Sequence, residues 1–185
     1  MSNTTLLGLS GSLRKASHNR QLIREAARLF HPGQFIEGDL NLPLYDGDLE
    51  DAEGIPASVQ ALADQIAQAD AIVISTPEYN QSLSGVLKNA LDWISRTQGS
   101  PWKGKPVALI SAAAGRSGGA RGNYALRLAM QPFRTHMLQG EFLLAGAAKE
   151  FGDDGKLVDE KPIKLLAGLM DDLRDAAGLE AIARD

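Results

Sequence analysis

The sequence predicts an α/β fold in which helices cover both faces of a five-stranded parallel sheet. Short continuous apolar runs alternate with helical stripes of apolar residues, which is the pattern of alternating strands and helices. The runs lack a polar face, as expected of strands that are buried on both sides. The length of 185 residues suits one domain with its own core. We therefore expect a single domain over residues 1–185.

The first half of the chain contains three apolar runs, each ending in polar or small residues. They predict strands at residues 4–10, 34–40 and 69–75. Apolar residues at helical spacing predict a helix over about 18–30 and another through 59–66. The stretch 41–56 carries acids, glycines and prolines without a period, so we expect a loop there.

The second half repeats the same strand and helix unit. Further strands are expected at residues 106–112 and 140–146. Helices are expected through 86–94, over about 120–137 and through 163–173, the last fraying after Gly178. With the two helices of the first half, this gives five strands and five helices.

Composition excludes several classes of function. The net charge of −4 argues against a surface that binds nucleic acid. The absence of cysteine excludes thiolate nucleophiles, disulfides and iron–sulfur clusters, and the three histidines form no metal-ligand pattern. The start MSNTTLLGLSGS does not resemble a signal peptide, and no segment has the apolar length of a membrane span. We expect a cytoplasmic protein that binds no metal and no membrane.

The segment SGSLRKASHN (10–19) places hydroxyl, amide and guanidinium groups between the first predicted strand and its helix. Ligands of parallel α/β sheets bind beyond the carboxyl ends of the strands. The free N–H groups and the dipole at a helix start favour an anion. Capping by Ser17 or Asn19 would explain one of these side chains but not all of them. A phosphate is therefore expected at Ser10, Ser12, Arg14, Ser17 and Asn19.

Two more loops follow strands at this edge. In TPEYNQSLSG (76–85), Pro77 stiffens the loop, and the next three residues offer a flat ring and hydrogen-bonding groups that suit a planar heteroaromatic ligand. An ordinary turn is the alternative for this loop, and simple flexibility for the glycines of SAAAGRSGGARG (111–122). Together with the phosphate site, the loops indicate a mononucleotide.

The sequence can be compared with three known motifs that bind nucleotides or carry a catalytic serine. The chain lacks both the G-x-G-x-x-G dinucleotide fingerprint and the G-x-x-x-x-G-K-[ST] triphosphate loop. The string GLSGS misses the G-x-S-x-G nucleophile elbow by one glycine. A serine hydrolase centred on Ser10 therefore stays as an alternative.

In their order and spacing, SGSLRKASHN, TPEYNQSLSGVLKNALDW and SAAAGRSGGARG resemble the NADPH-dependent FMN reductase family, which includes bacterial quinone and chromate reductases. The resemblance implies a flavodoxin-like α/β/α sandwich. It implies that the first loop holds the FMN phosphate and ribityl chain, and that Ser111 and Gly115 close the site. It also implies that the isoalloxazine lies against Pro77, Glu78, Tyr79 and Asn80. Ala113 and Ala114 depart from the family's common serine and proline.

The resemblance further implies an enzyme that passes electrons from NADPH or NADH through FMN to a small acceptor, such as a quinone, an azo compound, chromate or free flavin. FMN carries this chemistry, so no catalytic side chain is expected. Arg116 could meet the 2′-phosphate of NADPH or simply be solvated. Family members form homodimers or homotetramers. A flavodoxin-type electron carrier would share the fold and FMN, and is the second alternative.

Overall fold

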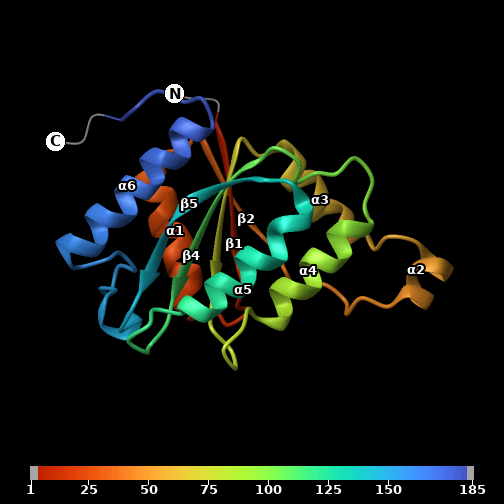
Figure 1. Ribbon diagram of the computed structural model, residues 1–185, viewed down its shortest axis with the longest axis horizontal. Helices are drawn as coiled ribbons and strands as arrows, with labels where there is room; N and C mark the ends of the chain where they lie inside the picture. Colours follow the sequence, from red (N-terminus) through yellow and green to blue (C-terminus); the bar gives the residue numbers. More distant parts are fainter. Residues whose placement is uncertain (1–3, 183–185) are drawn as a thin grey trace.

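The structure is a computed structural model that describes residues 4–182 (Figure 1). Within that range, five parallel strands form one sheet in the order β2-β1-β3-β4-β5. The strands are β1 (Thr5–Ser10), β2 (Gln34–Gly38), β3 (Ala71–Thr76), β4 (Pro106–Ala112) and β5 (His136–Leu144). The order reverses direction between β1 and β3, which is the topology of flavodoxin-like folds. The expected five-stranded parallel sheet is confirmed.

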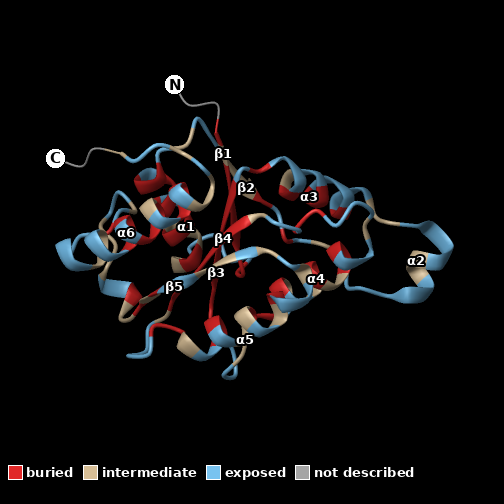
Figure 2. Ribbon diagram, turned by 45° about the horizontal axis from the view of Figure 1, so that its top comes forward, coloured by how far each residue is buried: buried red, intermediate tan, exposed pale blue. Residues whose placement is uncertain are grey.

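Helices cover both faces of the sheet and give three layers (Figure 1). On one face, α1 (His18–Phe30) and α6 (Glu160–Ala176) bury their apolar sides against the strands. The other face packs against α3 (Ala57–Gln68), α4 (Gly85–Arg96) and α5 (Ala120–Met130). Figure 2 shows buried residues on the strands and on the inner sides of these helices.

The apolar residues that recur at helical spacing in the sequence are the ones that pack against the sheet, because residues three and four apart share one side of a helix. In α1, Leu22, Ile23 and Phe30 are fully buried. Ser17 caps its start by accepting a hydrogen bond from the Arg20 N–H, and His31, with a left-handed φ of 51°, ends it. The expected helix over 18–30 is confirmed, and the loop 10–17 leads directly into its amino end.

The expectation of a structureless loop over 41–56 is wrong, because residues Gly47–Glu53 form α2, a sixth α-helix within the described range. Asp46 caps it, and none of its residues is buried. It projects from the body of the molecule at the right of Figure 1. A helix that buries none of its residues has no apolar period, so its sequence carries no helical stripe.

The expected helix over 120–137 is too long, and the last strand begins earlier than expected. α5 ends at Met130, a 3₁₀ turn covers Gln131–Phe133, and β5 starts at His136. Pro132 lacks the N–H that a continuing helix needs, and Arg134 takes a left-handed φ of 54°. α6 likewise ends at Ala176, before Gly178.

None of the helices within residues 4–182 combines the length and apolar character that a bilayer crossing requires.

Candidate functional site

A cleft of about 310 Å³ lies at the carboxyl edge of the sheet, where the loops after β1, β3 and β4 meet. This edge is the lower one in Figure 1. Seven of the predicted site residues line the cleft: Ser12, Arg14, Ser17, Asn19, Pro77, Glu78 and Tyr79. The third loop contributes Ala112, Ala113 and Ala114. Four predicted residues are not among the lining residues: Ser10 and Ser111, which lie at the ends of β1 and β4, and Asn80 and Gly115, which lie in the second and third loops.

The serine hydroxyls of the first loop lie in a chain of long contacts with backbone N–H groups. Ser10 Oγ lies 3.4 Å from the Ser12 N–H, Ser12 Oγ 3.4 Å from the Arg14 N–H, and Ser17 Oγ 3.4 Å from the Arg20 N–H. In these contacts the hydroxyl oxygen is the acceptor. The hydroxyl protons of Ser12 and Ser17 have no acceptor within residues 4–182. Both are therefore available to an anion in the cleft.

Positive charge and a helix dipole reinforce these donors. Arg14 is exposed beside the cleft, and its guanidinium has no ion-pair partner among the described residues. α1 begins at His18, so its first N–H groups face the end of the cleft that the serines line. An unpaired guanidinium, hydroxyl donors and a helix amino terminus are the groups that phosphate sites in proteins use.

Asn19 has a structural task that its side-chain chemistry alone does not reveal. Its Oδ1 accepts from the Ser75 hydroxyl at 2.8 Å and from the Ala112 N–H at 3.0 Å. Its Nδ2 donates to the Ala112 carbonyl at 3.0 Å. Asn19 is buried at the cleft wall and ties the start of α1 to β3 and β4. Its amide keeps one N–H for a ligand.

The second loop is a tight hairpin. Tyr79 and Ser82 exchange two backbone hydrogen bonds of 3.1 Å. Between them, Asn80 and Gln81 both have left-handed φ values of 48° and 65°. Two successive positive φ values are the requirement of a type I′ turn. Asn80 therefore forms the turn, while Tyr79, 48% exposed, stands at the cleft.

Glu78 joins this hairpin to α5. Its Oε2 accepts from the Arg121 N–H at 3.1 Å, and its Oε1 lies 3.5 Å from the Arg121 guanidinium. Gly119, the residue before α5, makes no side-chain cap. Glu78 therefore supplies the carboxylate that the helix start favours. Its carboxylate is therefore paired with Arg121 within the protein.

Two glycines let the loops approach closely. A Cβ on Gly11 would lie 2.9 Å from Pro77 Cδ, and a Cβ on Gly122 would lie 2.7 Å from the Pro77 carbonyl oxygen. Such distances are shorter than carbon and oxygen contacts in proteins tolerate. The first loop, the hairpin and α5 therefore hold one another in place.

Ser111 supports the third loop from beneath. It is fully buried, and its hydroxyl donates to the Gly118 carbonyl at 2.5 Å. Gly118 and Gly119 have left-handed φ values of 61° and 87°, which suit glycine. Gly115 has no neighbour within 4 Å of the position of a Cβ, so it lies in the open part of the loop.

His18 lines the cleft although the sequence did not single it out as a site residue. Its ring stacks on Phe151 at 5.9 Å between centroids, with 3° between the planes. Its Nδ1 lies 3.0 Å from Gln21 Oε1. The sequence feature that could have identified His18 as a cleft residue is its position, since it is the first residue of the helix that follows the serine loop.

The comparisons with known proteins agree with this geometry. The model of the NADPH-dependent FMN reductase family matches residues 4–149. The chain belongs to the NADPH-dependent FMN reductase family. It is 43% identical over 164 residues to an NAD(P)H-dependent FMN reductase of Pseudomonas aeruginosa, a match that covers 87% of this chain and 88% of the relative. The same family resemblance was expected from the three loops, and it is confirmed.

Other members of the family are similar over the same extent. A quinone reductase of Escherichia coli is 38% identical over 165 residues, covering 86% of this chain and 88% of that protein. Among solved structures, the flavoenzyme NAD(P)H:(acceptor) oxidoreductase FerB from Paracoccus denitrificans superposes with a TM-score of 0.85 at 34% identity. That superposition covers 97% of this chain and 100% of FerB. It extends beyond residue 149, so α6 belongs to the shared fold.

The serine hydrolase alternative gains no support from the structure. The hydrogen bonds of the Ser10 hydroxyl within residues 4–182 go to the backbone of Ser12, not to a histidine. A serine nucleophile needs a base within hydrogen-bond reach.

Proposed function

We propose that this chain is an FMN-dependent oxidoreductase that transfers electrons from NAD(P)H to a quinone or a similar small acceptor. The observation that carries the proposal is the cleft itself. It combines hydroxyl donors and an unpaired arginine at the start of α1 with the half-exposed ring of Tyr79, within a chain of the FMN reductase family. A relative in the same family is named a quinone reductase, which supports quinones as the acceptor class.

The residues of the cleft fit FMN. Its volume of about 310 Å³ lies in the range of small-molecule sites. The free hydroxyl protons of Ser12 and Ser17 and the Arg14 guanidinium would hold the phosphate. Pro77, Tyr79 and the 112–114 backbone would line the isoalloxazine. Ser10, Asn19, Asn80 and Ser111 would act mainly by shaping the loops, given the bonds they make to the protein.

Bound FMN supplies the electron chemistry, which is hydride acceptance from NAD(P)H and electron transfer to the acceptor. The protein orients the two partners and balances charge. α1 and Arg14 stabilise the phosphate in a chain whose net charge is −4. Tyr79 leaves one side of the cleft accessible, so the donor and the acceptor can use the same face in turn. This access favours an enzyme over a flavodoxin-type carrier, and it predicts ping-pong kinetics.

Donor preference and assembly are part of the same proposal. Arg116 in the third loop is exposed and has no ion pair among the described residues, so it is available to the 2′-phosphate of NADPH. We expect a homodimer or a homotetramer, as the family resemblance implies. The cytoplasmic location inferred from the sequence also stays a prediction.

The decisive test of the phosphate site compares Arg14→Ala with Lys15→Ala. Both residues are exposed cations of one loop, but only Arg14 lines the cleft. A hydrogen bond to a charged group contributes about 1.5–3 kcal/mol, so Arg14→Ala should raise the FMN Kd by roughly tenfold or more. Lys15→Ala should change it much less. Equal effects of the two substitutions, measured by FMN fluorescence titration, would refute the assignment of the first loop.

The proposed activity is tested by stopped-flow mixing of the FMN-loaded protein with NADPH and then with a quinone. Rapid bleaching of the flavin absorbance, followed by its return with quinone, is expected. A carrier would be reduced only slowly by NADPH. Failure of the purified protein to bind FMN would refute the proposal. Labelling of Ser10 by a fluorophosphonate would favour the hydrolase instead.

A further inference from the structure

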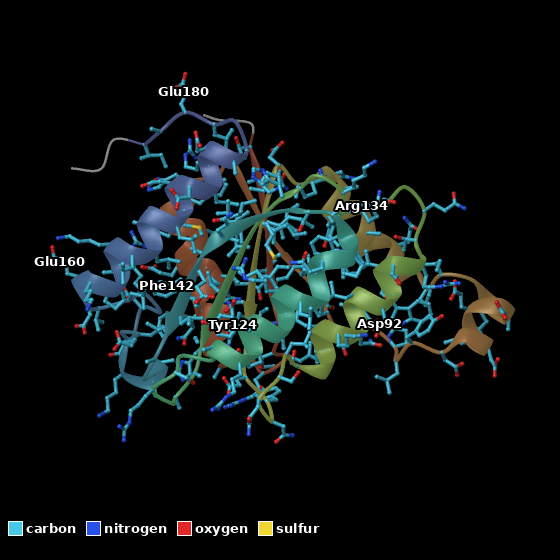
Figure 3. All side chains as sticks on the ribbon, viewed as in Figure 1. Asp92, Tyr124, Arg134, Phe142, Glu160 and Glu180 are labelled. Atoms are coloured by element: carbon cyan, nitrogen blue, oxygen red, sulfur yellow. The ribbon has the colours of Figure 1, made fainter. Side chains whose placement is uncertain are left out.

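A second cavity, of about 430 Å³, lies at the edge of the sheet opposite the FMN cleft. It is formed by the end of α4, the loop after it and the 3₁₀ turn that follows α5. Figure 3 labels Arg134, one of its residues, at the upper end of α5, and Tyr124 at the lower end near the cleft loops. The cavity shares no lining residue with the cleft. The proposed electron transfer leaves it without a role.

Buried apolar residues line the floor of this cavity. Ile94 and Trp102 line it and are buried, with 1% and 3% of their surfaces exposed. The rings of Trp102 and Phe133 lie 6.1 Å apart between centroids at an interplanar angle of 57°. Aromatic walls of this kind bury planar ligands.

Trp102 also carries a buried donor without an acceptor. Its Nε1 is inaccessible to solvent and has no hydrogen-bond partner within residues 4–182. The other tryptophan behaves differently, since Trp93 Nε1 donates to the Pro43 carbonyl at 2.8 Å. Buried indole N–H groups normally find an acceptor. Because solvent does not reach Nε1, this N–H lies behind the cavity wall, where its NMR signal can report on a ligand that contacts the indole ring.

Two cations stand at the same cavity. Lys103 and Arg134 line it, are exposed, and form no ion pair with any described residue. Arg134 and Ser100, also a lining residue, have left-handed φ values of 54° and 50°. The Arg134 carbonyl accepts from the Gly104 N–H at 2.9 Å, which fixes the two segments together. Non-glycine residues held in this region of φ cluster at ligand sites.

We propose that this cavity binds a small flat organic anion of the aromatic carboxylate class. The ring packs against Phe133 and the solvent-facing part of Trp102, and the carboxylate is neutralised by Lys103 and Arg134. This site goes beyond the electron transfer proposed above and does not depend on it.

The test uses the FMN-loaded protein, so that the cleft is occupied, and 2-naphthoate as the probe. The two indole N–H signals are followed by NMR, with Trp102→Phe to assign them. We expect 2-naphthoate to shift the Trp102 signal saturably and to leave that of Trp93 unchanged. The neutral 2-naphthamide should bind more weakly, and inorganic phosphate should shift neither signal.

Charge variants test the role of the cations. Lys103→Gln and Arg134→Gln should each weaken 2-naphthoate binding by about threefold to fivefold, the scale of exposed ion pairs. Lys161→Gln, an exposed position on α6 outside the cavity, is the control and should not change it. An unmoved Trp102 signal overturns the proposal, as would equal binding of the amide. Unchanged affinity in both cation variants would overturn it too.

Discussion

Gly122 marks the closest contact between a helix and the hairpin of the cleft. A Cβ added there would meet three backbone atoms, the Pro77 carbonyl oxygen at 2.7 Å, Glu78 Cα at 3.0 Å and the Ser82 carbonyl oxygen at 3.1 Å. No flexible side chain can move aside to make room. Gly122→Ala should therefore push the hairpin away from α5.

The expected magnitude combines two opposing effects. Overpacking of this kind costs about 1–3 kcal/mol. Alanine gains about 0.5–1 kcal/mol over glycine inside a helix. The difference is a net loss of about 0–2.5 kcal/mol in the free energy of unfolding, which lowers the Tm of a chain of this size by up to roughly 10 °C. Since Tyr79 moves with the hairpin, FMN binding should weaken as well.

Gly168 provides the matched control. It lies in the middle of α6, and a Cβ there would have no neighbour within 4 Å. Gly168→Ala should therefore raise the Tm by about 1–4 °C and leave FMN binding unchanged. Thermal unfolding followed by circular dichroism and FMN titration measure both effects. If Gly122→Ala were as stabilising as Gly168→Ala, the close packing of α5 on the hairpin would be refuted.

Three further predictions follow from single side chains. Asn19→Ala removes three buried hydrogen bonds and should lower the free energy of unfolding, measured with urea, by about 2–4 kcal/mol. Gln81→Gly should stabilise the hairpin by about 1 kcal/mol in the same assay, because φ at Gln81 is 65°. Hydrogen bonds from Arg96 and Tyr45 hold the pKa of Glu50 below its ordinary 4.5. The stabilisation of α2 by ionised Glu50 should thus be complete above pH 4.5 and be lost as the pH falls through the lowered pKa. Amide hydrogen exchange of α2 measures this pH dependence, which should be absent in Glu50→Gln.

The sheet and most helices follow from the sequence because their burial leaves a periodic trace. The central strands β1, β3 and β4 are buried on both faces, and α1 repeats its buried residues at helical spacing. α2 leaves no such trace, since it is held by Glu50 and Arg96 at 2.9 Å and by the Asp46 cap rather than by a core. Pattern reading detects buried faces, and α2 has none.

The candidate site follows from the sequence at the level of loops, not of individual side chains. Ser17, Asn19 and Ser111 all offer hydrogen bonds, and nothing in the residue types says where those bonds go. In the structure Ser111 donates to Gly118 and Asn19 bonds across two strands, while Ser17 keeps its proton free. The direction of a side chain depends on backbone that comes from distant parts of the chain, which a local motif does not encode.

The two alanines of the third loop show where a departure from the family pattern alters chemistry without altering shape. Ala113 donates its N–H to the Leu144 carbonyl at 3.0 Å, and its own carbonyl accepts from the Ala147 N–H at 3.1 Å. The backbone at this position is therefore fixed by the strand end of β5 and the turn after it, whatever side chain the residue carries. The missing serine at Ala113 removes a hydroxyl from a backbone that these two bonds hold in place. Any loss of flavin affinity caused by Ala113 should therefore come from the missing hydroxyl rather than from a displaced backbone.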